Sequence, residues 1–166
     1  RGLDGAAAAP DGVAGPEPQT ETVWRQADKY QVPRMCFINK MDRTGADFYY
    51  VLDTIQDRLG CNTAVVQLPI GAESEFIGIV DLVEMNALVW QGEDLGATWD
   101  VVDIPEDLVE KAEEFRAGLI DVLSVFDDNI LEKFVGGEEI TAADMRSAVR
   151  TGTLAGLCVP VLTGSA

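Results

Sequence analysis

The residues of this chain best suited to recognise a ligand are Asn39, Lys40 and Asp42, which follow the apolar run 35–38. Asp42 has two carboxylate oxygens, which can accept hydrogen bonds from two neighbouring donors, such as the N1–H and the exocyclic amine of guanine. The amide of Asn39 can meet the base N7 and brace a neighbouring loop, while the alkyl stem of Lys40 can lie over the base. Met41 should point into the protein. The pattern N-K-x-D thus predicts a guanine site; the alternative is a polar turn with Asp42 as a helix cap.

Two apolar strands would hold the candidate residues. The run 35–38 is typical of a buried strand in a parallel sheet, and open α/β sheets bind ligands at the carboxyl ends of their strands. The last apolar run, 159–162, leads into Gly164, Ser165 and Ala166. Both elements resemble those of P-loop GTPases, in which Ser-Ala after the last strand presents a backbone N–H to guanine O6 and small side chains allow close approach.

Longer segments resemble one family of proteins, bacterial-type translation elongation factor G. They are Q-T-E-T-V-W-R-Q-A at 19–27, V-P-R-M-C-F-I-N-K-M-D-R-T-G-A-D-F at 32–48, Q-L-P-I-G at 67–71 and the final G-S-A. The resemblance runs over nearly the whole chain. Ribosome-protection proteins of tetracycline resistance and peptide release factor three are related alternatives, but the continuation 43–48 resembles the elongation factor. The resemblance implies an α/β fold, the C-terminal half of a P-loop GTPase G domain, with a partial parallel sheet and helices.

The phosphate-binding parts of such a GTPase have no counterpart in the sequence. No segment matches G-x-x-x-x-G-K-S/T or D-x-P-G-H, and the glycine cluster 12–15 is followed by Pro16 and Pro18 rather than by G-K-S/T. In the resembled family these parts lie upstream of the position of Arg1. We therefore expect a fragment without catalytic residues and inactive alone. It would contribute base recognition for GTP or GDP, with Mg²⁺ bound only in the full-length parent.

The charge of the chain limits the partners that it can have. Twelve basic and 29 acidic residues give a net charge of −17, which disfavours direct nucleic-acid binding. The three cysteines have no metal-ligand spacing and there is no histidine, so no metal site is expected and a reduced, cytoplasmic setting is favoured, with an organellar matrix as the alternative. No apolar run is long enough to cross a bilayer, so no membrane partner is expected.

The first predicted unit, 1–70, combines strands and helices. The resemblance implies a strand at 3–9, but the alanines and Pro10 disfavour a strand there. A helix is expected from Thr20 or Glu21 to Tyr30, with a core-facing stripe of Val23, Trp24 and Ala27. A second helix should span 47–59 and stop at Gly60, before a strand at 63–68.

A predicted insert, 71–156, explains why Asp42 and Gly164 are 122 positions apart. It should contain hairpin strands at 76–82 and 85–90, a polar loop at 92–100 and a helix opened by Pro105 that runs to Phe126. A helix at 128–135 and a capping box at 141–144 should follow. This small α+β subdomain resembles the G-prime insert of elongation factor G, and 157–166 would return to the first unit.

One face of the helix after Pro105 is acidic, and it includes Glu106, Glu110, Glu113 and Glu114. The surface can be a solvated helix face that keeps the protein soluble. It can also dock a basic protein, and in the resembled family the insert faces the stalk protein of the large ribosomal subunit. The resemblance therefore implies a ribosomal partner, while a non-enzymatic acidic binding module remains the alternative for the chain itself.

Overall fold

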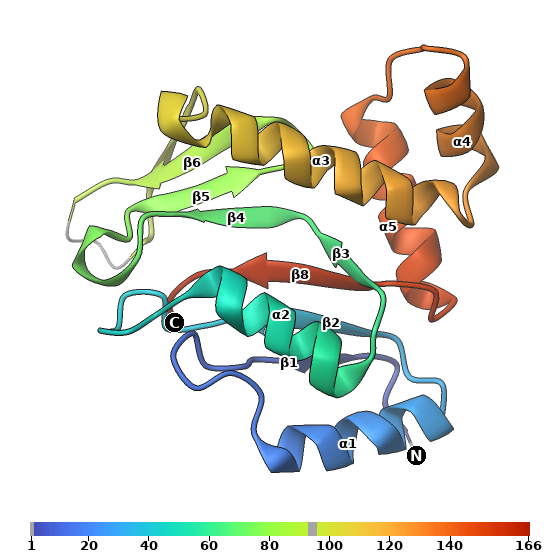
Figure 1. The fold of residues 1–166 in the computed structure, drawn as a ribbon, viewed down its shortest axis with the longest axis horizontal. Helices are drawn as coiled ribbons and strands as arrows, with labels where there is room; N and C mark the ends of the chain where they lie inside the picture. Colours follow the sequence, from blue (N-terminus) through green and yellow to red (C-terminus); the bar gives the residue numbers. More distant parts are fainter. Residues whose placement is uncertain (1, 93–95) are drawn as a thin grey trace.

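The computed structural model describes residues 2–92 and 96–166, which form two sheets of different kinds (Figure 1). The parallel sheet has the order β1-β2-β8-β3 and consists of β1 (Ala6–Ala8), β2 (Arg34–Ile38), β8 (Val159–Thr163) and β3 (Thr63–Val65). The antiparallel sheet has the order β4-β5-β6-β7 and consists of β4 (Gln67–Ile70), β5 (Gly78–Asp81), β6 (Asn86–Trp90) and β7 (Trp99–Val102). The expected fold class, a partial parallel sheet with helices and an additional α+β part, is confirmed.

Helix α2 (Phe48–Leu59) begins one residue after the predicted start, with Asp47 as its N-cap, and ends at the predicted residue. The carboxylate of Asp47 accepts a hydrogen bond from the Tyr50 N–H at 3.1 Å, which satisfies one of the free donors of the first turn. Gly60 ends the helix at a φ of 62°, a left-handed conformation that glycine adopts readily. The apolar face of α2 is buried, and α1 (Pro18–Lys29) lies beside it (Figure 1).

Helix α1 differs from its prediction in two respects. It begins at Pro18, before the expected start, because proline is well suited to the first helical position, where no N–H is required. Trp24 is buried as expected, and the Arg34 guanidinium lies 4.8 Å from its ring centroid. Val23, however, is 67% exposed, so the prediction that it contributes to the core is wrong. Adjacent helical residues point in different directions: Trp24 is buried, Ala27 is half-buried and Val23 is exposed.

Strand β1 forms despite its alanines. Ala6 pairs with Arg34 and Ala8 with Cys36, in parallel register, at the edge of the sheet. Backbone hydrogen bonds to the neighbouring strand stabilise this short strand, so it forms although alanine has a low propensity for β-strands.

The chain passes from one sheet to the other at Val66. The prediction of a single strand at 63–68 is wrong, because β3 ends at Val65 and β4 begins at Gln67. The Val66 N–H donates to Val161 O at 3.1 Å, while Val66 O accepts from the Leu82 N–H at 3.0 Å. Strand β4 therefore belongs to the antiparallel sheet, although the predicted first unit extends to residue 70. The proposed division into 1–70, 71–156 and 157–166 stays a prediction.

The antiparallel sheet contains the expected hairpin and one strand more. Strands β5 and β6 pair, and the Asp81 carboxylate accepts from the Val83 N–H at 2.8 Å in their turn. The polar loop predicted at 92–100 is too long, because β7 already begins at Trp99 and pairs with β6. Positions 93–95 of that loop lie outside the described residues. All four residues of β7 are exposed.

Three helices complete the second part of the molecule. A 3₁₀ turn (Glu106–Leu108) follows Pro105, so α3 (Val109–Ser124) is shorter at both ends than the predicted helix. Helix α4 (Asp128–Val135) has the predicted bounds, and the predicted capping box precedes α5 (Ala142–Leu154). Figure 1 shows α3 running alongside the antiparallel sheet, and the Arg116 guanidinium on α3 donates to Leu82 O at 2.6 Å.

Candidate functional site

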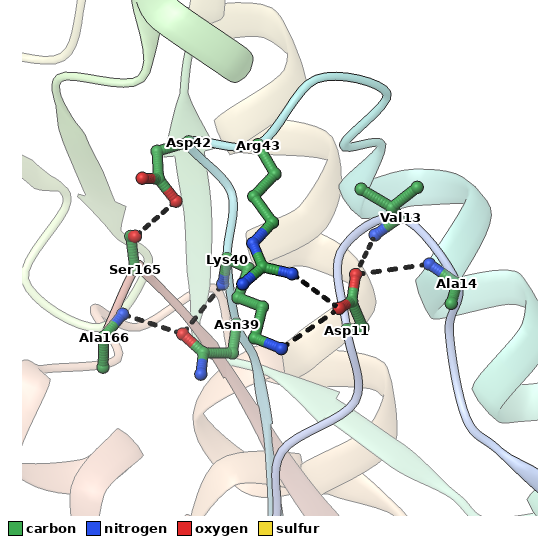
Figure 2. A network of polar contacts seen from close by, with 9 residues as sticks. All are labelled: Asp11, Val13, Ala14, Asn39, Lys40, Asp42, Arg43, Ser165 and Ala166. Atoms are coloured by element: carbon green, nitrogen blue, oxygen red, sulfur yellow. Dashed lines mark hydrogen bonds and ion pairs between the residues drawn. The ribbon is translucent and has the colours of Figure 1, made fainter.

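The loops after β2 and β8 meet at the carboxyl-terminal ends of these two central strands of the parallel sheet (Figure 2). Ile38 is the register partner of Thr163, so Asn39 and Gly164 leave neighbouring strands at the same level. The Gly164 N–H donates to Ile38 O at 3.1 Å, and the Met41 N–H donates to Gly164 O at 3.2 Å. The structure therefore brings together the two segments that the sequence singled out. Their part in base recognition stays a prediction.

Asn39 joins the two loops through its side-chain oxygen. Oδ1 accepts from the Ala166 N–H and from the Lys40 N–H, each at 2.8 Å. The amide oxygen therefore faces protein donors, and the two N–H donors of the amide are left for a ligand acceptor or another protein group. The Ala166 N–H is engaged by Asn39, so a guanine O6 would have to share or replace that contact.

Asp42 is exposed, and Ser165 lies against it. The Ser165 hydroxyl donates to Asp42 Oδ1 at 2.5 Å (Figure 2). A carboxylate has about four lone-pair sites, so this contact fixes its orientation and leaves acceptor capacity for a pair of donors. Met41, beside it, is buried, as the sequence predicted.

Lys40 is held by a residue that the sequence did not single out. Its backbone has a φ of 61°, and its Nζ lies 3.4 Å from Asp11 Oδ2. The Arg43 guanidinium lies 3.8 Å from the same oxygen. Figure 2 shows both cations directed at Asp11, which follows β1. The sequence signal was the Asp-Gly pair at 11–12, typical of a turn, but nothing local indicates that this turn meets Lys40.

The glycine cluster 12–15 forms a turn around the same carboxylate. Asp11 Oδ1 accepts from the Val13 N–H at 2.8 Å and the Ala14 N–H at 3.3 Å. These two donors are therefore used within the protein. Gly12 lies so close to the N-K-x-D loop that a Cβ there would be 2.9 Å from Asn39 O.

Within residues 2–92 and 96–166, no group of three or more histidine, cysteine or acidic side chains is placed to hold a metal ion. Among the same residues, no helix is long and apolar enough to cross a membrane. The three cysteines are free thiols, and burial raises the pKa of Cys36 to about 12, which keeps this thiol protonated and unreactive at neutral pH.

The predicted docking residues lie on α3 or just before it, in a different part of the chain from the loops after β2 and β8. Glu106, in the 3₁₀ turn, and Glu110, Glu113 and Glu114 are all exposed. The two basic residues of the helix are engaged by the protein instead. Lys111 Nζ lies 4.0 Å from the ring centroid of Tyr49, and Arg116 binds backbone carbonyls. The solvent-facing side of α3 is therefore left without a compensating cation from the helix itself.

Comparisons with known proteins agree with this architecture. The sequence matches the elongation factor Tu GTP-binding domain family over residues 1–166. The fold is similar to that of a protein from Thermus thermophilus whose crystal structure is known, with a TM-score of 0.83 and 26% sequence identity. The match covers 98% of this chain and 24% of the Thermus chain, so this chain spans about a quarter of the length of that protein.

Proposed function

The chain belongs to the elongation factor Tu GTP-binding domain family of translational GTPases, and on this premise we propose that it is the base-recognition segment of an elongation factor G. In this proposal the complete factor is a cytoplasmic GTPase that drives translocation on the ribosome. Elongation factor G is favoured over the ribosome-protection and release-factor relatives by the sequence R-T-G-A-D-F at 43–48.

The observation that carries the proposal is the meeting of the two loops. Asn39 and Asp42 follow β2, and Ser165 and Ala166 follow β8. The Asp42 carboxylate accepts from the Ser165 hydroxyl, and the Asn39 side-chain oxygen accepts from the Ala166 N–H. The carboxylate of Asp42 would accept from the N1–H and exocyclic amine of guanine, and the Asn39 amide would donate to N7. The Lys40 stem would cover one face of the base, with its ammonium anchored at Asp11.

The proposed role is selectivity and affinity, not the chemical step. In-line attack of water on the γ-phosphate requires phosphate-cradling donors and Mg²⁺. The sequence motifs that provide these groups are not among residues 1–166, so residues outside this sequence would supply them in the complete factor. We propose that the 166-residue chain alone neither hydrolyses GTP nor binds it measurably.

Nucleotide selectivity of the complete factor tests the proposal. Asp42→Asn should weaken GDP binding by roughly tenfold or more, because an amide offers one accepting oxygen in place of two and hydrogen bonds to charged groups are strong. Xanthosine diphosphate has a carbonyl in place of the exocyclic amine, so the variant should bind it relatively better. Dissociation constants from fluorescent-nucleotide competition measure both effects.

Asp53→Asn is the matched control, since Asp53 is an exposed carboxylate on α2, away from the two loops. It should leave both dissociation constants unchanged. If Asp42→Asn discriminates guanosine from xanthosine diphosphate as well as the wild type does, Asp42 does not read the base.

We further propose that the acidic side of α3 docks a basic surface of the large-subunit stalk protein. The observation in favour is the engagement of Lys111 and Arg116 by the protein, which leaves only acidic residues of α3 as charges presented to solvent. They are Glu110, Glu113, Glu114 and Asp121. Opposite charge on a partner would steer the encounter. A solvated face without a partner is the competing explanation.

A further inference from the structure

The connection between β4 and β5 reaches from the antiparallel sheet to the N-K-x-D loop. The backbone N–H of Glu73 donates to Met41 O at 2.8 Å. Its carboxylate oxygen Oε1 accepts from the Gly45 N–H at 3.0 Å. Met41 and Gly45 lie on the two sides of Asp42, so one residue holds both flanks of the short segment that carries this carboxylate.

The backbone at Glu73 is fixed in an uncommon conformation. Its φ is 58°, in the left-handed region that residues other than glycine seldom adopt. The turn around it is tight, because Gly71 has a φ of 75° and a Cβ there would lie 2.1 Å from Glu75 O. The turn presents the Glu73 N–H and carboxylate to the same loop. A residue in such a conformation is held there by its surroundings, and two of the contacts at Glu73 are those to Met41 and Gly45.

Asp42 has few attachments of its own, although its neighbours have others: the Met41 N–H donates to Gly164 O, and the Arg43 guanidinium lies 3.8 Å from Asp11 Oδ2. The Asp42 carboxylate is exposed, and its contact with the opposite loop is a single hydrogen bond from Ser165. Within its own loop, the Arg43 N–H donates to Lys40 O at 3.1 Å and the Ala46 N–H donates to Arg43 O at 3.1 Å, which shapes the loop but does not attach it to the rest of the protein. A pair of parallel hydrogen bonds to a base edge tolerates little displacement of the carboxylate.

We propose that Glu73 is a positioning residue for guanine recognition, which holds the Met41–Gly45 segment so that Asp42 meets both donors of the base. The inference rests on the proposed function, because it assumes that Asp42 reads guanine. In this inference, the connection between β4 and β5 of the antiparallel sheet contributes to the nucleotide selectivity of the loop that follows β2 in the parallel sheet.

The test compares two nucleotides in the complete factor. Guanosine and inosine diphosphates differ only in the exocyclic amine, so the ratio of their dissociation constants reports the second hydrogen bond to Asp42. Glu73→Gly keeps the backbone N–H and suits the left-handed conformation, and it removes the whole side chain together with its carboxylate. We expect it to weaken GDP binding about tenfold, the effect of one charge-assisted hydrogen bond, and to weaken inosine diphosphate binding much less.

Two further variants separate positioning from folding. Glu73→Gln retains a side-chain oxygen that can accept from the Gly45 N–H, and it should restore most of the GDP preference. Glu75→Ala, an exposed glutamate of the same turn, should leave both constants unchanged. If Glu73→Gly weakens both nucleotides equally, or neither, the positioning role is refuted. Should Glu73→Gly fail to fold, Glu73→Asn decides, because asparagine tolerates the left-handed conformation and its side chain is one methylene shorter, which withdraws the oxygen from the Gly45 N–H. A loss of GDP preference in this variant with an unchanged melting temperature supports the role, and an unchanged preference refutes it.

Asp42→Asn, measured alongside, distinguishes failure of the inference from failure of the proposed function. If Asp42→Asn removes the difference between the two nucleotides while Glu73→Gly preserves it, only the assignment of Glu73 is wrong. If Asp42→Asn also preserves the difference, Asp42 does not read guanine and both proposals fall.

Discussion

At the scale of single residues, Asp11 joins two loops from different parts of the chain. One oxygen orders its own turn through Val13 and Ala14, and the other faces the cations of Lys40 and Arg43. The hydrogen bond from the Val13 N–H is the main cause that lowers the pKa of Asp11. The Ala14 N–H and the Lys40 ammonium act in the same direction, and burial opposes them.

This lowered pKa makes the contribution of Asp11 to stability depend on pH. The contribution is fully present above the unfolded-state pKa of about 3.9 and is lost as the pH falls through the lower folded-state value. Asp11→Ala should lower the free energy of unfolding by about 1 kcal/mol at neutral pH, a modest value because Lys40 is partly exposed. The difference from the wild type should shrink below about pH 4.

Urea titrations at a series of pH values measure this effect. Asp4→Ala, a change at an exposed carboxylate of the same terminal segment, should show little effect at any pH. A penalty for Asp11→Ala that stays constant down to the lowest pH would mean that the ionised carboxylate is not what stabilises the turn.

At the scale of helices, two glycines show how the environment decides the effect of one substitution. Gly152 on α5 is buried, and a Cβ there would lie 2.4 Å from Phe126 Cζ and 2.9 Å from Cys158 Sγ. Gly118 on α3 is exposed, and a Cβ there would have no neighbour within 4 Å among the described residues. Alanine favours the helical backbone equally at both positions, so the difference between them isolates packing.

Gly152→Ala should destabilise the protein by about 1–3 kcal/mol, because the Phe126 ring must move out of a packed position. Gly118→Ala should stabilise it by about 0.5–1 kcal/mol through the lower entropy of the unfolded chain. Chemical denaturation of the two variants beside the wild type gives both values. Effects of the same sign would contradict the packing assigned to α5.

At the scale of the whole molecule, charge is distributed unevenly. The net charge is −17, and the two cations of α3 are engaged by the protein. The acidic side of α3 therefore adds to the overall negative field instead of being neutralised locally. This arrangement favours encounter with a basic partner and weakens as salt screens it.

Replacing Glu110, Glu113 and Glu114 by lysine should reduce stalk-dependent stimulation of GTP hydrolysis by the complete factor several-fold, since it reverses the charge of the proposed docking face. A stalk-reconstituted GTPase assay at two salt concentrations measures the effect. The control replaces Asp4, Asp53 and Asp57, exposed acidic residues away from α3, and changes the net charge equally. Equal stimulation of GTP hydrolysis in the two triple variants would contradict the docking proposal and indicate that the acidic face of α3 is solvated and has no partner.

Local signals in the sequence were enough to place many helices and strands, and also the two loops that follow β2 and β8. The caps Asp47 and Gly60, the capping box at Thr141 and the bounds of α4 depend on residues within a few positions of one another. The sequence also predicts that Asn39 and Ser165 lie close together. Each motif directly follows a strand, and the carboxyl ends of neighbouring parallel strands lie side by side.

Tertiary structure decided what depends on distant partners. The run 63–68 has no turn residue, and only the pairing of Val66 with both Val161 and Leu82 shows that it divides between two sheets. Asp11 and Glu73 reach the N-K-x-D region across 29 and 28 positions of sequence, at Lys40 and Gly45. The sequence by itself thus indicated the residues that we propose to read a base, since that proposal depends on side-chain chemistry and local order. Which residues hold them in place was decided by the fold, because hydrogen bonds between segments that are remote in sequence depend on the tertiary arrangement of those segments.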